Sequence, residues 1–67
     1  MHERLKLALD ALDYDSVKEL HYKSNLVHAI QVFALMKGDD EIEAACDAEI
    51  ENIRQEVAKR QSGGKGK

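Results

Sequence analysis

Apolar residues recur at helical intervals in three stretches of the chain, with short polar segments between them. The first stretch repeats leucine and alanine every three or four residues, which predicts a helix over residues 3–12. Residues 13–16 then include two aspartates and a serine, whose side chains compete with helical backbone hydrogen bonds. We therefore expect a turn or kink there. An unbroken helix over residues 3–36 is the alternative, because neither proline nor glycine forces a stop.

The second stretch predicts a helix over residues 17–37, with a capping box that begins at Ser16. Gly38 follows and supplies the left-handed conformation in which many helices end. Asp40 then starts a third helix over residues 40–61. Because this connection is short, we expect the second and third helices to form an antiparallel hairpin.

The third helix carries its apolar residues on one stripe, so it needs cover on one side only. The stripe consists of Ile42, Cys46, Ile50, Ile53 and Val57. The last residues, 62–67, are glycine and lysine with one serine, a composition typical of a flexible tail. We therefore predict one all-α domain over residues 1–61, followed by that tail.

The second helix has more apolar surface than one hairpin can cover. On a helical wheel, Leu26, Ile30 and Phe33 centre the face that we expect to join the chain's own core. The apolar residues well outside that face are Val32, Leu35 and Met36. We predict that two hairpins pair through this helix as a dimeric helical bundle, with the first helix as an arm on the mate or packed on its own chain. The alternative is a monomeric three-helix bundle in which the first helix covers the surplus.

Length and composition favour association. A chain of 67 residues has a core that supplies no more than about 3 to 5 kcal/mol in most cases, and its single cysteine excludes an internal disulfide. A lone thiol and the lack of a signal-peptide pattern predict a cytoplasmic protein. The most apolar run, residues 26–36, is about half the roughly 20 residues that span a bilayer, so we expect no membrane insertion.

No pattern in the sequence predicts catalysis, a cofactor or a metal. His21 and His28 share a helical face but lie about 10 Å apart along the axis, too far to hold one metal ion within the helix. We interpret His28 as part of a polar strip at an interface. Cys46 lies on the apolar stripe of the third helix, where a buried, inert thiol is expected.

Charge is unevenly distributed along a chain whose net charge is −3. Residues 39–51 contain acids and no base, whereas bases dominate from residue 54 onward. Complementarity to the helix dipole explains most of this arrangement. Repulsive pairs four residues apart leave room for an acidic docking face made of Asp39, Asp40, Glu43, Asp47 and Glu51. Acids at the start of the third helix count against nucleic-acid binding through that helix.

The function that these patterns favour is a non-enzymatic module that binds another protein and modulates it, with inhibition as the expected effect. Small helical regulators such as antitoxin-like factors and phage-encoded modulators share this size and acidity, although no motif carries the comparison. One alternative is a purely structural oligomer. Another is a nucleic-acid-associated factor that uses the basic C-terminus. The residues expected at a partner or dimer interface are Tyr14, Tyr22, His28, Val32, Phe33, Leu35 and Met36.

Overall fold

The computed structural model describes the backbone of residues 1–65 and the side chains of residues 1–61. This part of the chain is helical, with no strand, which confirms the all-α prediction. Its elements are α1 (Glu3–Ala11), the 3-10 turn η1 (Tyr14–Ser16), α2 (Leu20–Lys37) and α3 (Asp40–Lys65). The three predicted helices are therefore present, with altered ends.

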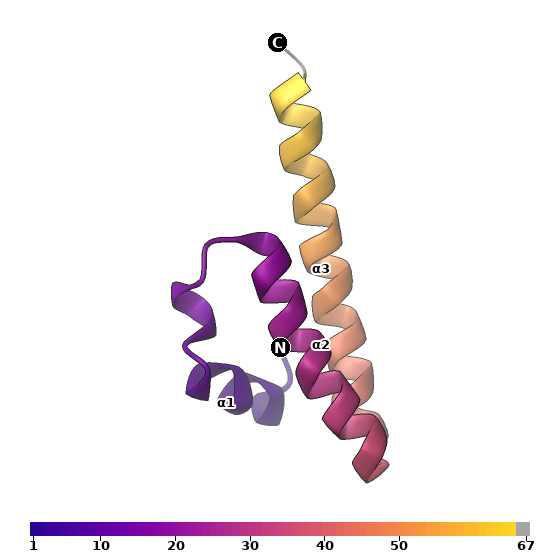
Figure 1. Cartoon of the computed structure of the whole chain (residues 1–67). Helices are drawn as coiled ribbons and strands as arrows, with labels where there is room; N and C mark the ends of the chain where they lie inside the picture. Colours follow the sequence, from indigo (N-terminus) through magenta and orange to yellow (C-terminus); the bar gives the residue numbers. More distant parts are fainter. Residues whose placement is uncertain (66–67) are drawn as a thin grey trace.

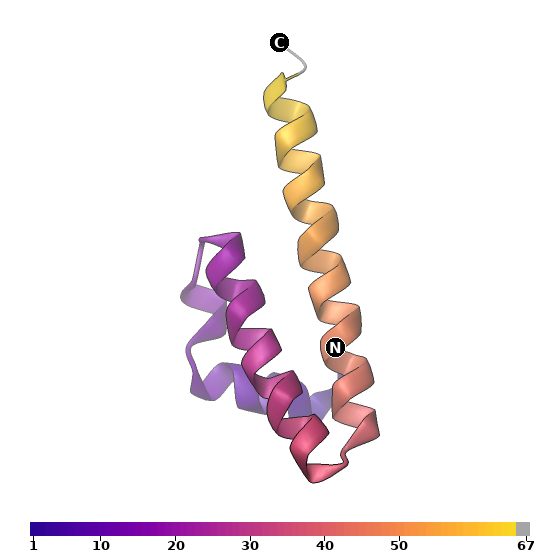
Figure 2. The same ribbon diagram turned by 45° about the vertical axis from the view of Figure 1, so that its right-hand side comes forward.

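Helices α2 and α3 form the expected antiparallel hairpin (Figures 1 and 2). Gly38 ends α2 with a φ of 72°, in the left-handed region, and its N–H donates to the carbonyl of Leu35 at 3.2 Å. The N–H of Asp39 donates to the carbonyl of Ala34, and its carboxylate caps α3 by accepting from the N–H of Ile42 at 3.2 Å. The connection was predictable because each of these contacts is local in sequence.

The turn between α1 and α2 is present, so the alternative of an unbroken helix is wrong. The capping box at Ser16 is also wrong. Asp13 adopts a left-handed conformation with a φ of 57°, which allows η1 to form, and the Ser16 hydroxyl donates to the carbonyl of Asp13 at 2.9 Å. Glu19 caps α2 instead, because its carboxylate accepts from the N–H of Tyr22 at 2.9 Å.

Helix α3 is longer than expected and projects beyond the N-terminal end of α2 (Figure 1). Residues 62–65, predicted as flexible tail, continue the helical backbone. Extending a formed helix adds one hydrogen bond per residue, and glycine weakens it by only about 1 kcal/mol relative to alanine. Residues 66 and 67 of the predicted tail lie outside the described part of the chain.

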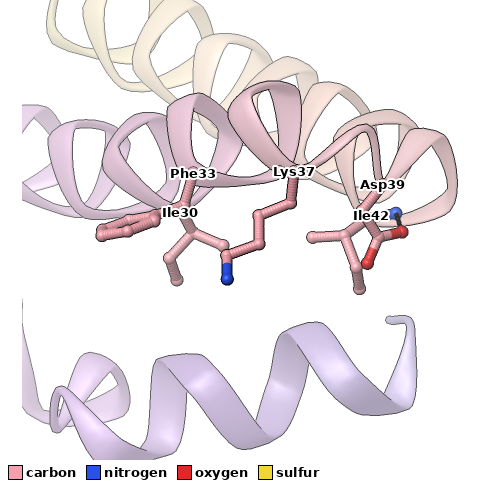
Figure 3. A pocket seen from close by; sticks show the side chains of 6 residues that line it. Ile30, Phe33, Lys37, Asp39 and Ile42 are labelled. Atoms are coloured by element: carbon pink, nitrogen blue, oxygen red, sulfur yellow. Dashed lines mark hydrogen bonds between the residues drawn. The ribbon is translucent and has the colours of Figure 1, made fainter.

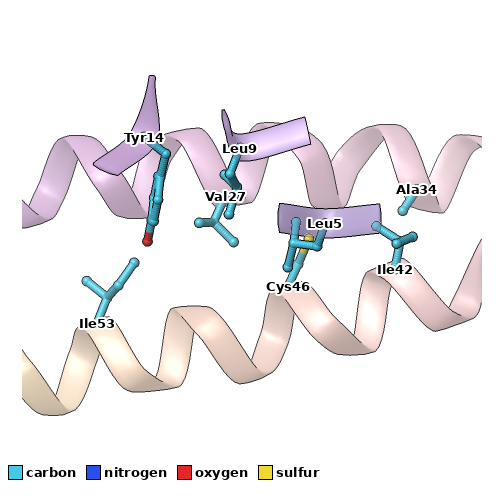
Figure 4. Close-up of a cluster of buried hydrophobic side chains, with 8 residues drawn as sticks. All are labelled: Leu5, Leu9, Tyr14, Val27, Ala34, Ile42, Cys46 and Ile53. Carbon is cyan, nitrogen blue, oxygen red and sulfur yellow. The ribbon is translucent and has the colours of Figure 1, made fainter. Parts of the chain in front are cut away.

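Helix α1 packs on its own hairpin, contacting both α2 and α3. Its Leu5 and Leu9 are fully buried against Val27 of α2 and Cys46 of α3 (Figure 4). The stripe predicted for α3 is confirmed, since its residues belong to this core or pack against it. Burial raises the pKa of the Cys46 thiol, as expected for an inert buried cysteine.

Candidate interaction surface

The face of α2 that enters the core differs from the predicted one. Val27, Gln31 and Ala34 are buried, while Leu26 and Ile30 are half-buried and Phe33 is exposed. Each buried residue follows a residue of the predicted face by one position, as Gln31 follows Ile30, and one residue of an α-helix turns by about 100°. The face that meets the core is therefore rotated by about 100° from the predicted face. Hydrophobicity could not choose between the faces, because α2 is apolar nearly all round. On the face that meets α3, Ala34 is small and Gln31 donates a hydrogen bond to Asp47 of α3.

The opposite side of α2 carries a second apolar seam, which we call the outer face. It consists of Tyr22, Leu26, Ala29, Phe33 and Met36. The spacing along the sequence is four, three, four and three, so these side chains line up on one helical face. Tyr22, Phe33 and Met36 each expose more than half of their surface, and Leu26 is partly covered by the core. A continuous apolar seam therefore faces outward.

The surplus residues predicted for α2 are exposed in the structure. Val32, Leu35 and Met36 have exposed fractions of 42%, 56% and 78%. Helix α1 does not cover them, because its fully buried leucines face the groove between α2 and α3 on another side. The alternative in which the first helix covers the surplus is therefore wrong for these three residues.

An open pocket of about 230 Å³ lies beside the outer face, near the hairpin turn (Figure 3). Ile30, Phe33, Ala34 and Ile42 provide its apolar lining, and α1 runs opposite these side chains. Lys37 and Asp39 add one positive and one negative group. A pocket with this mainly apolar lining is of a kind that can accept an apolar side chain of a partner protein.

A short polar network links α2 to α3. His28 Nδ1 lies 3.2 Å from the side-chain oxygen of Gln31, and the Gln31 amide donates to the carboxylate of Asp47. Gln31 is buried, whereas His28 and Asp47 are exposed. His28 is therefore accessible at the edge of α2, as an interface residue would have to be, and Asp47 has a structural partner within the chain.

One of the five residues of the expected acidic face, Asp39, does not lie with the others. Asp40, Asp47 and Glu51 share one exposed side of α3, with the half-buried Glu43 at its edge. Glu51 accepts from Arg54 at 3.4 Å, which partly offsets its charge. Asp39 is turned to α1 instead, so the acidic side that could meet a partner comprises four of the five predicted residues.

Two bases at the start of α1 hold the hairpin turn, an arrangement that the sequence interpretation missed. Arg4 pairs with Asp39 at 2.9 Å and with Glu41 at 2.7 Å, and His2 Nε2 lies 3.3 Å from Glu41. The pKa of Asp39 is lowered, first by the N–H of Ile42 and then by Arg4. The pKa of Glu41 is lowered by hydrogen bonds from His2 and Arg4. The sequence held one signal for this arrangement: residues 39–51 contain acids and no base, so a base that pairs with them has to come from another segment.

Tyr14 was expected at an interface, and the structure places it in the core instead. Only 3% of its surface is exposed, its hydroxyl donates to Glu49 at 2.9 Å, and the Lys23 ammonium lies 4.5 Å from its ring centre. Burial, followed by the charge and hydrogen bond of Glu49, raises its pKa well above the ordinary value. An aromatic residue that follows a turn offered no sequence signal to separate core from surface.

No family model matches this chain, and no curated protein or solved structure matches it at a significant level. Within the described residues, no cluster of three or more histidine, cysteine or carboxylate side chains could hold a metal ion. None of the helices described is both long enough and apolar enough to pass through a membrane. The function is therefore inferred from the geometry of the chain's own residues.

Proposed function

We propose that this chain is a small, non-enzymatic interaction module that binds another protein and modulates it, with inhibition as the simplest effect. The observation that supports the proposal best is the outer face of α2, where large apolar residues such as Phe33 and Met36 stay exposed. Contiguous exposed apolar patches on small soluble proteins mark interaction sites. Aromatic residues and methionine are also the apolar types enriched in protein interfaces.

The acidic side of α3 supports an electropositive partner. Asp47 is linked through Gln31 to His28, which lies at the edge of α2. Asp40 and Glu51 share the side of α3 that carries Asp47, so this acidic side lies next to that edge. Charges at the rim of an interface steer a complementary partner and reject a like-charged one. A partner that places basic residues against α3 would meet Val32 and Leu35 on the neighbouring helix.

The pairing of two hairpins into a dimeric bundle and a cytoplasmic location belong to the same proposal. The size of the chain and its lone thiol support them. A purely structural oligomer remains the competing function, in which self-association covers every exposed apolar residue of α2 and no further protein binds. A hydrophobic dye separates the two functions, because a chain kept for a further partner retains an exposed patch and binds the dye.

Affinity purification of the tagged chain from its native host, at low and at high salt, tests the proposal. We expect wild type to enrich a specific protein, and Phe33→Glu to lose it because a charge is placed on the outer face. Asp47→Asn, which keeps an acceptor oxygen for Gln31, should weaken capture mainly at low salt. Leu7→Glu on α1 is the matched control, since Leu7 and Phe33 have equal exposed fractions of 65%. Equal capture by wild type and Phe33→Glu, or no partner at either salt, would contradict the proposal.

A further inference from the structure

We infer that the outer face of α2 pairs with the outer face of α2 in a second copy, antiparallel, about a two-fold axis at Ala29. This inference rests on the proposed function, because it assigns the outer face to a second copy of the chain and leaves Val32, Leu35 and the acidic side of α3 to the other protein. Helix α2 carries two seams with the same spacing on opposite sides. The inner seam, which meets α3, consists of Leu20, Ser24, Val27, Gln31 and Ala34. The outer seam repeats that spacing, and although Leu26 packs partly against the core, Tyr22, Phe33 and Met36 each stay more than half exposed.

The amount of exposed surface supports a missing partner. The chain exposes 4876 Å², whereas a compact monomer of its mass of 7.5 kDa exposes about 4200 Å². The elongated shape, 46 × 21 × 17 Å, with its projecting end of α3, contributes to this excess, and Phe33 and Met36 are among the large apolar residues exposed. A standard interface buries about 800 Å² per partner, or about a sixth of this surface. One face of an 18-residue helix with its flanks can supply an area of that order.

The outer seam complements itself when it is reversed. Around Ala29, the order of side chains places Leu26 opposite the partner's Phe33 and Tyr22 opposite the partner's Met36. Ala29 meets the partner's Ala29 at the axis, where two small side chains let the helix backbones approach closely. Each large residue then faces a different apolar residue, and methionine adapts to the shape of its neighbour. A two-fold interface requires this kind of self-complementary surface.

Charge selects the antiparallel orientation. The hairpin end of the molecule is acidic, with Asp40, Glu41 and Glu43 near the turn, although Arg4 offsets part of this charge. The opposite end carries Lys18 next to Glu19 at the start of α2, and Lys59 and Arg60 beside Glu56 on the projecting part of α3, so it is less acidic than the hairpin end. A parallel pair would bring the two acidic ends together, which is repulsive. An antiparallel pair instead places each acidic end near the partner's less acidic end, where Lys18 lies.

Cysteine crosslinking between two variants tests the orientation. Tyr22→Cys and Met36→Cys, at exposed positions, are mixed under mild oxidation, with one chain isotope-labelled so that mass spectrometry identifies which chains are joined. We expect covalent heterodimers from the mixture and no covalent dimer from either variant alone. Wild type is the control for background oxidation, because its Cys46 is buried. Circular dichroism of each variant checks that the helices are retained.

Covalent dimers of Tyr22→Cys alone would show a parallel pair and overturn the inference. The absence of any crosslink, together with a mass of 7.5 kDa by sedimentation equilibrium, would also overturn it. Failure here differs from failure of the proposed function. A chain that captures a host protein through Phe33 but stays monomeric contradicts only the antiparallel pair. A crosslinked pair that captures no host protein contradicts only the binding of another protein.

Discussion

Gln31 on α2 donates its side-chain amide to the carboxylate of Asp47 on α3, and it does so with only 8% of its own surface exposed. A buried amide that loses its acceptor costs about 1 to 3 kcal/mol, whereas an apolar residue of similar shape has no such requirement. This pair therefore fixes which face of α2 meets α3, on a helix whose apolar residues would permit others.

The first prediction concerns this pair. Asp47→Ala should destabilise the chain by about 1 to 2 kcal/mol because it leaves the Gln31 amide without its acceptor. Gln31→Met in the same chain should recover most of that loss, since nothing polar is then left unpaired. Urea unfolding followed by circular dichroism measures both changes. If the double variant is no more stable than Asp47→Ala alone, the pair does not fix the face.

The second prediction separates the inner and outer faces of α2. Val27 is fully buried, so Val27→Asp should abolish the helical fold, because burying an unpaired charge costs more than a core of this size supplies. Phe33→Glu should keep the helical content of the monomer, since Phe33 is mostly exposed. Circular dichroism in dilute solution compares the two variants. Equal loss of helix in both would mean that Phe33 belongs to the core, as the sequence alone suggested.

The third prediction follows from the raised pKa of Tyr14. Its phenol stays neutral in the folded chain but ionises near pH 10 once unfolded, so the stability it contributes is complete below pH 10 and declines above it. Wild type should be more stable than Tyr14→Phe at pH 8, through the hydrogen bond to Glu49. That difference should shrink between pH 10 and 11. Urea midpoints that keep a constant difference from pH 8 to 11 would contradict it.

The fourth prediction concerns the ion pairs between α1 and the hairpin turn. The pKa values of Asp39 and Glu41 are lowered, so the stability that they contribute is present above their ordinary values near 4 and is lost as the pH falls. Arg4→Gln should therefore be less stable than wild type at pH 7, and the difference should close below pH 4. High salt should reduce it at neutral pH.

Arg54→Gln is the control for this fourth prediction, because Arg54 makes an exposed pair within α3 at 3.4 Å. Such pairs contribute about 0 to 1 kcal/mol, so its stability should match that of wild type. Thermal unfolding at pH 3, 5 and 7 provides the comparison. An effect of Arg4→Gln that persists unchanged at pH 3 would show that packing, and not charge, is what the arginine supplies.

The parts of the fold that could be predicted depend on contacts local in sequence. Gly38 and Asp39 form the hairpin turn with residues a few positions away. The large apolar residues of α3 over residues 40–61 lie on one stripe through Cys46, so the sequence offered one face for the core. The turn at residues 13–16 was predicted, whereas its 3-10 form, η1, was not, because η1 depends on the left-handed backbone of Asp13, which aspartate adopts only in some contexts.

The face of α2 and the place of Tyr14 could not be predicted for a different reason. Both depend on residues distant in the sequence: Asp47 accepts from Gln31, and Glu49 accepts from Tyr14. The exposure of Val32, Leu35 and Met36 was predictable, because it follows from an excess of apolar residues that the short α1 and the single apolar stripe of α3 cannot cover. Tyr14 was assigned to an interface because aromatic residues are enriched there, a preference that does not distinguish an exposed aromatic residue from a buried one.

The oxidation of Met36 relative to Met1 tests most directly whether the outer face of α2 is an interface. These two methionines have the same chemistry and exposed fractions of 78% and 64% in the single chain, so Met1 is an internal standard. We predict that the ratio of sulfoxide at Met36 to that at Met1, measured by mass spectrometry, falls as the protein concentration rises, and is low in extract of the native host. A ratio that stays constant across concentrations and in the extract would show that nothing covers the outer face.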